Sequence, residues 1–178
     1  TTFEQYEDIY FSPELATYYE SLSTDDNASA NLKEQEGTYI DTDLRYSIIQ
    51  DKRDRRFQTT EGHRISFNQK VPLYSESASL LNGLDYTKYH AFSENLIGSL
   101  RFYGRSINAV FDSDDVKLSE RLTVPSKYLR GFENGKIGPV DALDHVGGNY
   151  ATALGFNAGL PKLLPNLTNA DISLFLDT

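Results

Sequence analysis

Long stretches in which apolar and polar residues alternate are the feature that most restricts the fold of this chain. Within residues 38–51, Ile40 and Leu44 have one parity, whereas Asp41 and Asp43 have the other. Because successive side chains of a β-strand point to opposite faces, this stretch predicts a strand with one apolar and one charged face. Comparable stretches occur at 62–74, 95–111, 148–160 and 170–177, with less regular ones at 8–23 and 78–92, where Pro13 and Asn82 interrupt the pattern. The sequence therefore predicts an all-β, antiparallel fold of about seven strands.

The predicted strands are long, and the segments that connect them differ between the two ends of the sheet. Several exceed the roughly 9–11 residues that a tilted strand needs to cross a bilayer. If consecutive strands are antiparallel, one side receives the segments 24–37, 74–77 and 112–147, two of which are long and polar. The other side receives 52–61, 92–95 and 161–169. Short turns on one side and long loops mainly on the other predict a transmembrane β-barrel of the outer-membrane type.

Alternation does not show which face of a strand is buried, so other classes stay open. A soluble β-barrel, a sandwich or a lipocalin-like binder would turn the apolar faces inward, whereas a passive porin would turn them outward. The net charge of −9 argues against a nucleic-acid partner, which would need a basic surface. The chain has no cysteine and therefore no disulfide. It begins at Thr1 and stops within the last predicted strand, so we expect a fragment of a longer protein.

The sequence predicts neither a metal site nor a catalytic site. His63, His90 and His145 are scattered and lack the spacing of a metal-binding motif. The acidic run 112–115 lacks the terminal glutamate of an EF-hand loop. Asp41 and Asp43 have the parity of a shared strand face, and we expect them to offset the charge of nearby Arg45 rather than to act as a glycosidase pair.

A glycine-rich part of segment 112–147 carries an arginine in an apolar setting. Arg130 follows Leu129 and precedes Gly131 and Phe132. If the segment extends into water, Arg130 is simply solvated. If the segment folds back into a barrel, Arg130 needs a carboxylate, because an unpaired buried charge is strongly unfavourable. Asp177 has the polar parity of the last predicted strand and could accept both arms of a guanidinium.

These residues carry a resemblance to a known family. Leu129, Arg130, Gly131 and Phe132 are followed by Gly-Gly-Asn-Tyr at 147–150 and by Phe175 and Asp177 in an F-x-D pattern. This order resembles the C-terminal barrel of BamA-type outer-membrane assembly factors, in which a [V/L]-R-G-[F/Y] motif meets an aromatic-x-Asp motif on a later strand. The family includes mitochondrial sorting-and-assembly proteins and two-partner secretion transporters. The sequence is most similar to the alphaproteobacterial type, although it stops before the family's following glycine.

A second stretch, residues 51–62, resembles the D-x-R-D…P-T-x-G turn of the same family. The matching residues are Asp51, Arg53, Asp54, Thr60 and Gly62, and Thr59 stands where the family has proline.

The resemblance implies that residues 1–178 form part of an outer-membrane β-barrel domain of about sixteen strands. Loop 112–147 would fold back into the lumen, with Arg130 as a latch cation and Asp177 as its counter-charge. Phe132 and Phe175 would be packing partners, Gly131 would supply backbone freedom and Leu129 would pack against the lumen wall.

The implied function is to help β-barrel proteins insert and fold into the bacterial outer membrane, without enzymatic activity or a cofactor. The implied partners are unfolded outer-membrane proteins, accessory assembly lipoproteins, and outer-membrane lipid and lipopolysaccharide. A two-partner secretion-type transporter and a passive porin are the alternatives.

Overall fold

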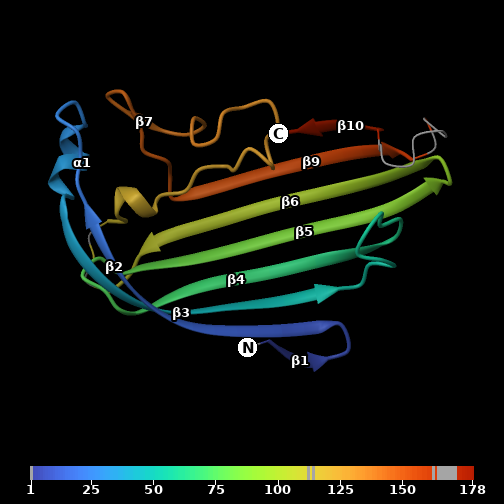
Figure 1. The fold of residues 1–178 in the computed structure, drawn as a ribbon, viewed down its shortest axis with the longest axis horizontal. Coiled ribbons are helices and arrows are strands. Elements are labelled where there is room, and N and C mark those ends of the chain that lie inside the picture. Colours follow the sequence, from blue (N-terminus) through green and yellow to red (C-terminus); the bar gives the residue numbers. More distant parts are fainter. Residues whose placement is uncertain (1, 112, 114, 162, 164–171) are drawn as a thin grey trace.

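The computed structural model describes residues 2–111, 113, 115–161, 163 and 172–178, and the long strands within them form one antiparallel sheet. Its strand order is β1-β2-β3-β4-β5-β6-β9-β10 (Figure 1). The strands are β1 (Phe3–Tyr6), β2 (Ile9–Leu22), β3 (Gly37–Asp51), β4 (Gly62–Tyr74), β5 (Ser79–Ser93), β6 (Leu96–Ala109), β9 (Tyr150–Leu160) and β10 (Ile172–Asp177). The connections contain α1 (Ala30–Glu34), the 3-10 turn η1 (Leu118–Glu120), β7 (Val140–Asp141) and β8 (Asp144–His145). No helix among the described residues is long and apolar enough to cross a membrane.

The predicted strands correspond to β2, β3, β4, β5, β6, β9 and β10, which confirms the all-β, antiparallel fold. The structure adds β1 at one edge, helix α1 and the β7–β8 hairpin. These elements are too short to show a period in the sequence, so alternation could not predict them.

Pro13 and Asn82 do not interrupt their strands, although the sequence pattern is irregular there. β2 continues through Pro13, which lies opposite Tyr46, and β5 continues through Asn82, which lies opposite Ser106. Pro13 lies just beyond the stretch of β2 that β1 covers, in a part of β2 that is paired on one side only, where proline is better tolerated than in a central strand.

The two faces of the sheet have opposite character. The outer face exposes large apolar side chains: Ile40, Leu44, Ile48, Leu84, Leu100, Leu154, Phe156, Leu174 and Leu176. The inner face buries polar and small residues: Asp41, Asp43, Ser66, Ser79, Tyr103, Ala151 and Ala153. A water-soluble sheet would bury its apolar face, whereas a strand in lipid turns that face outward. This distribution indicates a barrel wall that faces lipid and argues against the soluble alternatives.

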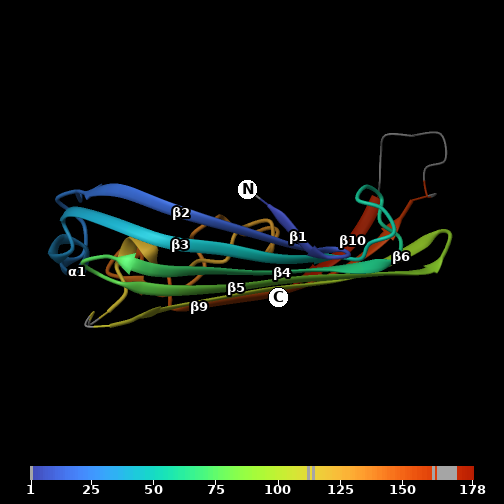
Figure 2. The same cartoon turned by 90° about the horizontal axis from the view of Figure 1, so that it is seen from below.

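The long loop, residues 110–149 between β6 and β9, lies against the inner face. Figure 1 shows it doubling back beside β9 at the top of the view, and Figure 2 shows the sheet edge-on as a single curved layer. The β2–β3 and β4–β5 connections lie at the same end of the sheet as the start of the long loop, and the β3–β4 and β5–β6 connections lie at the other end (Figure 1). Most of the predicted turn 161–169 lies outside the described residues.

Candidate functional site

The tip contact, which we define as Arg130 with Asp177, joins the long loop to the last strand of the sheet. Arg130 Nε donates to Asp177 Oδ2 at 2.6 Å, and one terminal nitrogen donates to Oδ1 at 2.7 Å. The backbone N–H of Arg130 also donates to Oδ2, at 3.1 Å. Two parallel charge-assisted hydrogen bonds fix both the distance and the orientation of the guanidinium. The hydrogen bond to Asp177 holds the pKa of the Arg130 guanidinium above its ordinary value.

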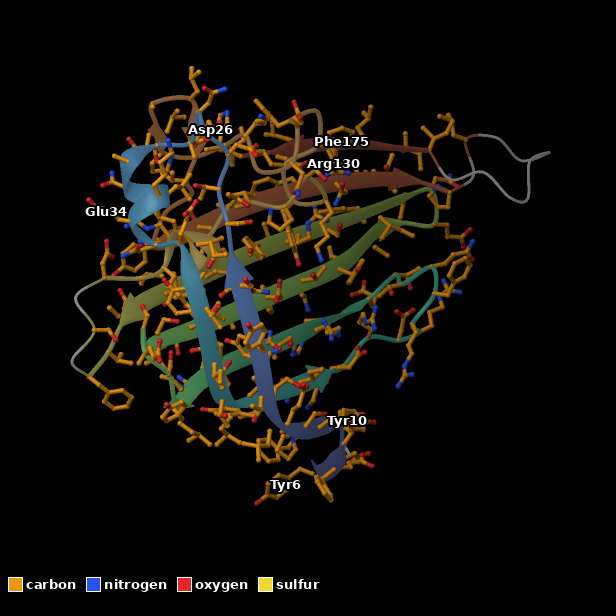
Figure 3. All side chains as sticks on the ribbon, turned by 60° about the vertical axis from the view of Figure 1, so that its left-hand side comes forward. Tyr6, Tyr10, Asp26, Glu34, Arg130 and Phe175 are labelled. Carbon is orange, nitrogen blue, oxygen red and sulfur yellow. The ribbon has the colours of Figure 1, made fainter. Side chains whose placement is uncertain are left out.

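Residues from β9, β10 and β6 surround this pair. The guanidinium carbon of Arg130 lies 3.7 Å from the centre of the Phe175 ring, and Figure 3 shows the two residues side by side. The same arginine donates to Asn157 Oδ1 at 2.8 Å. Arg101 of β6 also lies near Asp177, with 3.6 Å between a terminal nitrogen and Oδ1. Asp177 is only 3% exposed and has both cations within 4 Å, whereas Arg130 keeps 30% of its side chain in solvent.

Glycine on the wall makes room for these charges. A Cβ on Gly155 would lie 3.0 Å from Asp177 Oδ1 and 3.2 Å from a terminal nitrogen of Arg101. At Gly83, a Cβ would lie 2.8 Å from the Arg105 side chain. Both glycines lie opposite the arginine concerned in the strand register. Arg101 and Arg105 of β6 therefore occupy space that a side chain at Gly155 or Gly83 would fill.

The other residues of the predicted motif have different surroundings from those expected. Gly131 has a φ of 89°, a left-handed conformation that favours glycine, and no atom lies within 4 Å of where its Cβ would be. Phe132 is 54% exposed, and the close partner of the Phe175 ring among the described contacts is Arg130 rather than another ring. Leu129 is partly buried.

The apolar contact between loop and wall is made by residues that the sequence did not single out. Leu122, Val124 and Tyr128 pack against the buried cluster of Tyr103, Ala151 and Ala153. Their signal in the sequence is weak, because apolar residues in a loop show no strand parity. Only the folded loop brings them onto the wall.

Tyr128 makes a further contact halfway along the loop. Its ring stacks on Tyr103 at 4.3 Å between centroids, and its hydroxyl donates to Asp85 Oδ1 at 2.7 Å. Arg105 donates to the other oxygen of Asp85 at 2.6 Å. Burial and the hydrogen bond to Asp85 raise the pKa of Tyr128 to about 12. We call this the middle contact.

Asp41 and Asp43 were expected to share Arg45, and the structure corrects half of that expectation. Asp43 accepts a hydrogen bond from Arg45 at 3.2 Å. Asp41 instead accepts one from Lys117 of the long loop at 2.9 Å, and both side chains are only 3% exposed. No sequence pattern points to Lys117, because its partner lies on a strand far earlier in the chain.

The turn 51–62 is a compact hydrogen-bonded structure that joins the end of β3 to the start of β4. Asp51 accepts two hydrogen bonds from the Arg53 side chain, both at 2.7 Å. Asp54 accepts from the hydroxyl and the N–H of Thr60, at 2.7 and 3.1 Å, and the Thr60 hydroxyl is the main cause that lowers the pKa of Asp54 to about 2. Gly62 has a φ of 100°, and a Cβ there would lie 2.1 Å from the carbonyl oxygen of Lys52. The residues of this predicted turn therefore come together, and only glycine fits at position 62.

Comparisons with known proteins show the family and the fold. The family model described as the Omp85 superfamily domain matches residues 1–178. The crystal structure of BamA from Haemophilus ducreyi lacking POTRA domains 1–3 is similar to this chain with a TM-score of 0.82 and 16% sequence identity. The match covers 99% of this chain and 39% of that one, so this chain has the fold of part of that barrel. No curated protein matches the sequence. The family and the fold indicate an outer-membrane protein, and the chain belongs to the Omp85 superfamily.

Proposed function

We propose that this chain is part of the barrel wall of an assembly factor that helps β-barrel proteins insert and fold into the bacterial outer membrane. In this proposal the long loop lies in the barrel lumen, and the tip contact is its latch. The observation that carries the proposal is the bidentate contact of Arg130 with Asp177 at 2.6 and 2.7 Å. Membership of the Omp85 superfamily supports it.

The arrangement of the long loop favours this role over a passive porin. Lys117, Tyr128 and Arg130 attach the loop to β3, β5 and β10, so it crosses the inner face from one side of the sheet to the other. A porin lumen needs a continuous aqueous path, which a loop bound across the wall would obstruct.

The proposed partners follow from the function. Unfolded outer-membrane proteins would be the substrates, and an exposed strand edge elsewhere in the complete barrel would pair with them by β-augmentation. Accessory assembly lipoproteins, outer-membrane lipid and lipopolysaccharide would be further partners. The chemistry needs no covalent step, and we propose neither an enzymatic activity nor a cofactor. The assignment to the alphaproteobacterial type stays a prediction.

Charge reversal in the complete barrel protein tests the proposal. Arg130→Asp and Asp177→Arg each place like charges at the tip contact and should reduce the assembly of a substrate barrel into proteoliposomes. The double variant restores opposite charges and should recover part of the activity. Lys136→Asp, which reverses an exposed charge in the same loop, is the matched control.

Three outcomes would count against the proposal. Full assembly activity in both single variants would remove the role of the tip contact. Steady ion conductance of the unmodified protein in planar bilayers, without any effect on substrate folding, would favour a porin. Export of one dedicated partner protein, again without assembly of barrels, would favour a secretion-type transporter.

A further inference from the structure

The long loop has a second ionic attachment, at its start, which we call the root contact. Lys117 Nζ donates to Asp41 Oδ2 of β3 at 2.9 Å and to Glu20 Oε2 of β2 at 3.3 Å. Its ammonium also lies 4.6 Å from the centre of the Tyr39 ring. Burial lowers the pKa of Lys117, but the hydrogen bond to Asp41 and the nearby carboxylates outweigh that effect and raise it. The cation is therefore held charged, with only 3% of its side chain exposed.

The wall and the loop carry complementary charges at the root. Three residues after Lys117, Glu120 accepts from Lys70 Nζ of β4 at 2.6 Å and from Ser79 Oγ of β5. The loop thus presents a cation to a wall carboxylate and an anion to a wall ammonium. Because each charge would meet a like charge if the loop shifted or reversed, the two pairs set its position as well as its attachment.

Hydrogen bonds from uncharged donors, and apolar packing, also hold the start of the long loop near the root contact. The N–H of Leu118 donates to Gln35 Oε1 at 2.7 Å, and Gln35 is the residue that ends α1. Ser75 Oγ donates to the second oxygen of Asp41, so both oxygens of this buried carboxylate have partners. Val116 is 1% exposed. The start of the loop is therefore a packed structure, in contrast to the open surroundings of Gly131 and Gly135 near the tip.

We propose that Lys117 is a positioning residue that anchors the root of the long loop independently of the tip contact. With the root held on β2 and β3, the tip can leave Asp177 and return to it without the loop leaving the inner face. The two contacts lie on different strands, with no residue in common. This inference rests on the geometry of the loop and holds for any activity of the complete barrel.

Cysteine accessibility in the complete barrel protein tests the inference. This segment has no native cysteine, so Val116→Cys can report exposure of the root to a water-soluble maleimide. Lys117→Met should raise the labelling rate on the order of tenfold or more, because it leaves Asp41 buried without its cation. The exchanged pair Lys117→Asp with Asp41→Lys should restore much of the protection. Arg130→Ala should leave the labelling rate within about twofold of the starting protein.

The labelling rates of these variants support or overturn the independent root anchor. Unchanged labelling in Lys117→Met, or an equal increase in Arg130→Ala, would overturn the independent root anchor. If Lys117→Met yields no folded barrel, Glu20→Gln decides instead, since it removes one carboxylate while Asp41 remains. It should raise labelling by about twofold to fivefold, and no increase would overturn the inference. Because labelling measures the position of the loop, a failed assembly assay would count against the proposed function alone.

Discussion

The root contact and the tip contact are both ion pairs between the long loop and the inner wall, but they differ in burial and in design. At the root, Lys117 and Asp41 are each 3% exposed. At the tip, Asp177 is equally buried, but Arg130 is 30% exposed, and Arg101 lies close to Asp177 as a second cation. A fully buried pair depends on both members, whereas a half-exposed pair with a spare cation can open at lower cost. The comparison suggests a fixed root and a releasable tip.

The largest effect is expected at the root. Asp41→Ala leaves the buried ammonium of Lys117 with Glu20 alone and should destabilise the complete barrel by about 3–5 kcal/mol. Urea unfolding of the complete barrel in detergent, followed by electrophoretic mobility, would measure this loss. Glu133→Ala, which removes an exposed carboxylate from the same loop, should change stability by less than about 0.5 kcal/mol. If Glu133→Ala lost as much stability as Asp41→Ala, the larger effect could not be assigned to the buried ion pair at the root.

The tip should lose less, because Arg101 remains. Arg130→Ala should cost about 2 kcal/mol, and Arg101→Met alone about 1 kcal/mol or less. The double variant strips Asp177 of both cations, so its loss should exceed the sum of the single losses by about 1 kcal/mol or more. In the described residues, Arg101 Nε and one terminal nitrogen have no hydrogen-bond partner, which leaves them able to take over. Strict additivity in a double-mutant cycle would show that Arg101 is not a substitute.

The middle contact should contribute a pH dependence at alkaline pH, in addition to that of Lys117 at the root. The pKa of Tyr128 is raised from 10.0 to about 12, so its stabilising effect is fully present below pH 10. It is lost as the pH rises from 10 to about 12, because the unfolded phenol ionises first. Tyr128→Phe should cost about 1 kcal/mol at neutral pH and should flatten the alkaline slope of the unfolding free energy. An unchanged slope would remove Tyr128 as its source.

The smallest effect is expected from the aromatic ring at the tip. Phe175→Leu keeps an apolar side chain but removes the π face that lies 3.7 Å from the Arg130 guanidinium. We expect a loss of about 0.5–1 kcal/mol, measured by the same urea unfolding. Leu174→Phe, which enlarges a neighbouring side chain on the lipid-facing side, serves as the control for local repacking. A loss of more than about 2 kcal/mol would mean that Phe175 also packs structurally.

Parts of the site could be predicted because they depend on local pattern or on a motif. The parity of Asp177 predicts that it lies on the polar face of the last strand, and the resemblance of its F-x-D pattern to the family motif implies that this face is turned to the lumen. The turn from Asp51 to Gly62 is local, since its hydrogen bonds join residues close in sequence. The packing of Leu129 against the lumen wall stays a prediction, and the contacts of Leu122, Val124 and Tyr128 could not be predicted, because a loop has no period that shows which of its apolar residues reach the wall.

By itself, the sequence determined where the long strands lie and which side chains share a face. The period of two in a strand is a property of the backbone, and it is written directly into the order of residues. Only the tertiary structure decided that the apolar faces are turned outward and that Lys117 meets Asp41, 76 positions earlier. Pairing between a loop and a distant strand depends on how the sheet curves and on how the loop folds over it. Neither the curvature nor the loop conformation produces a periodic pattern in the sequence.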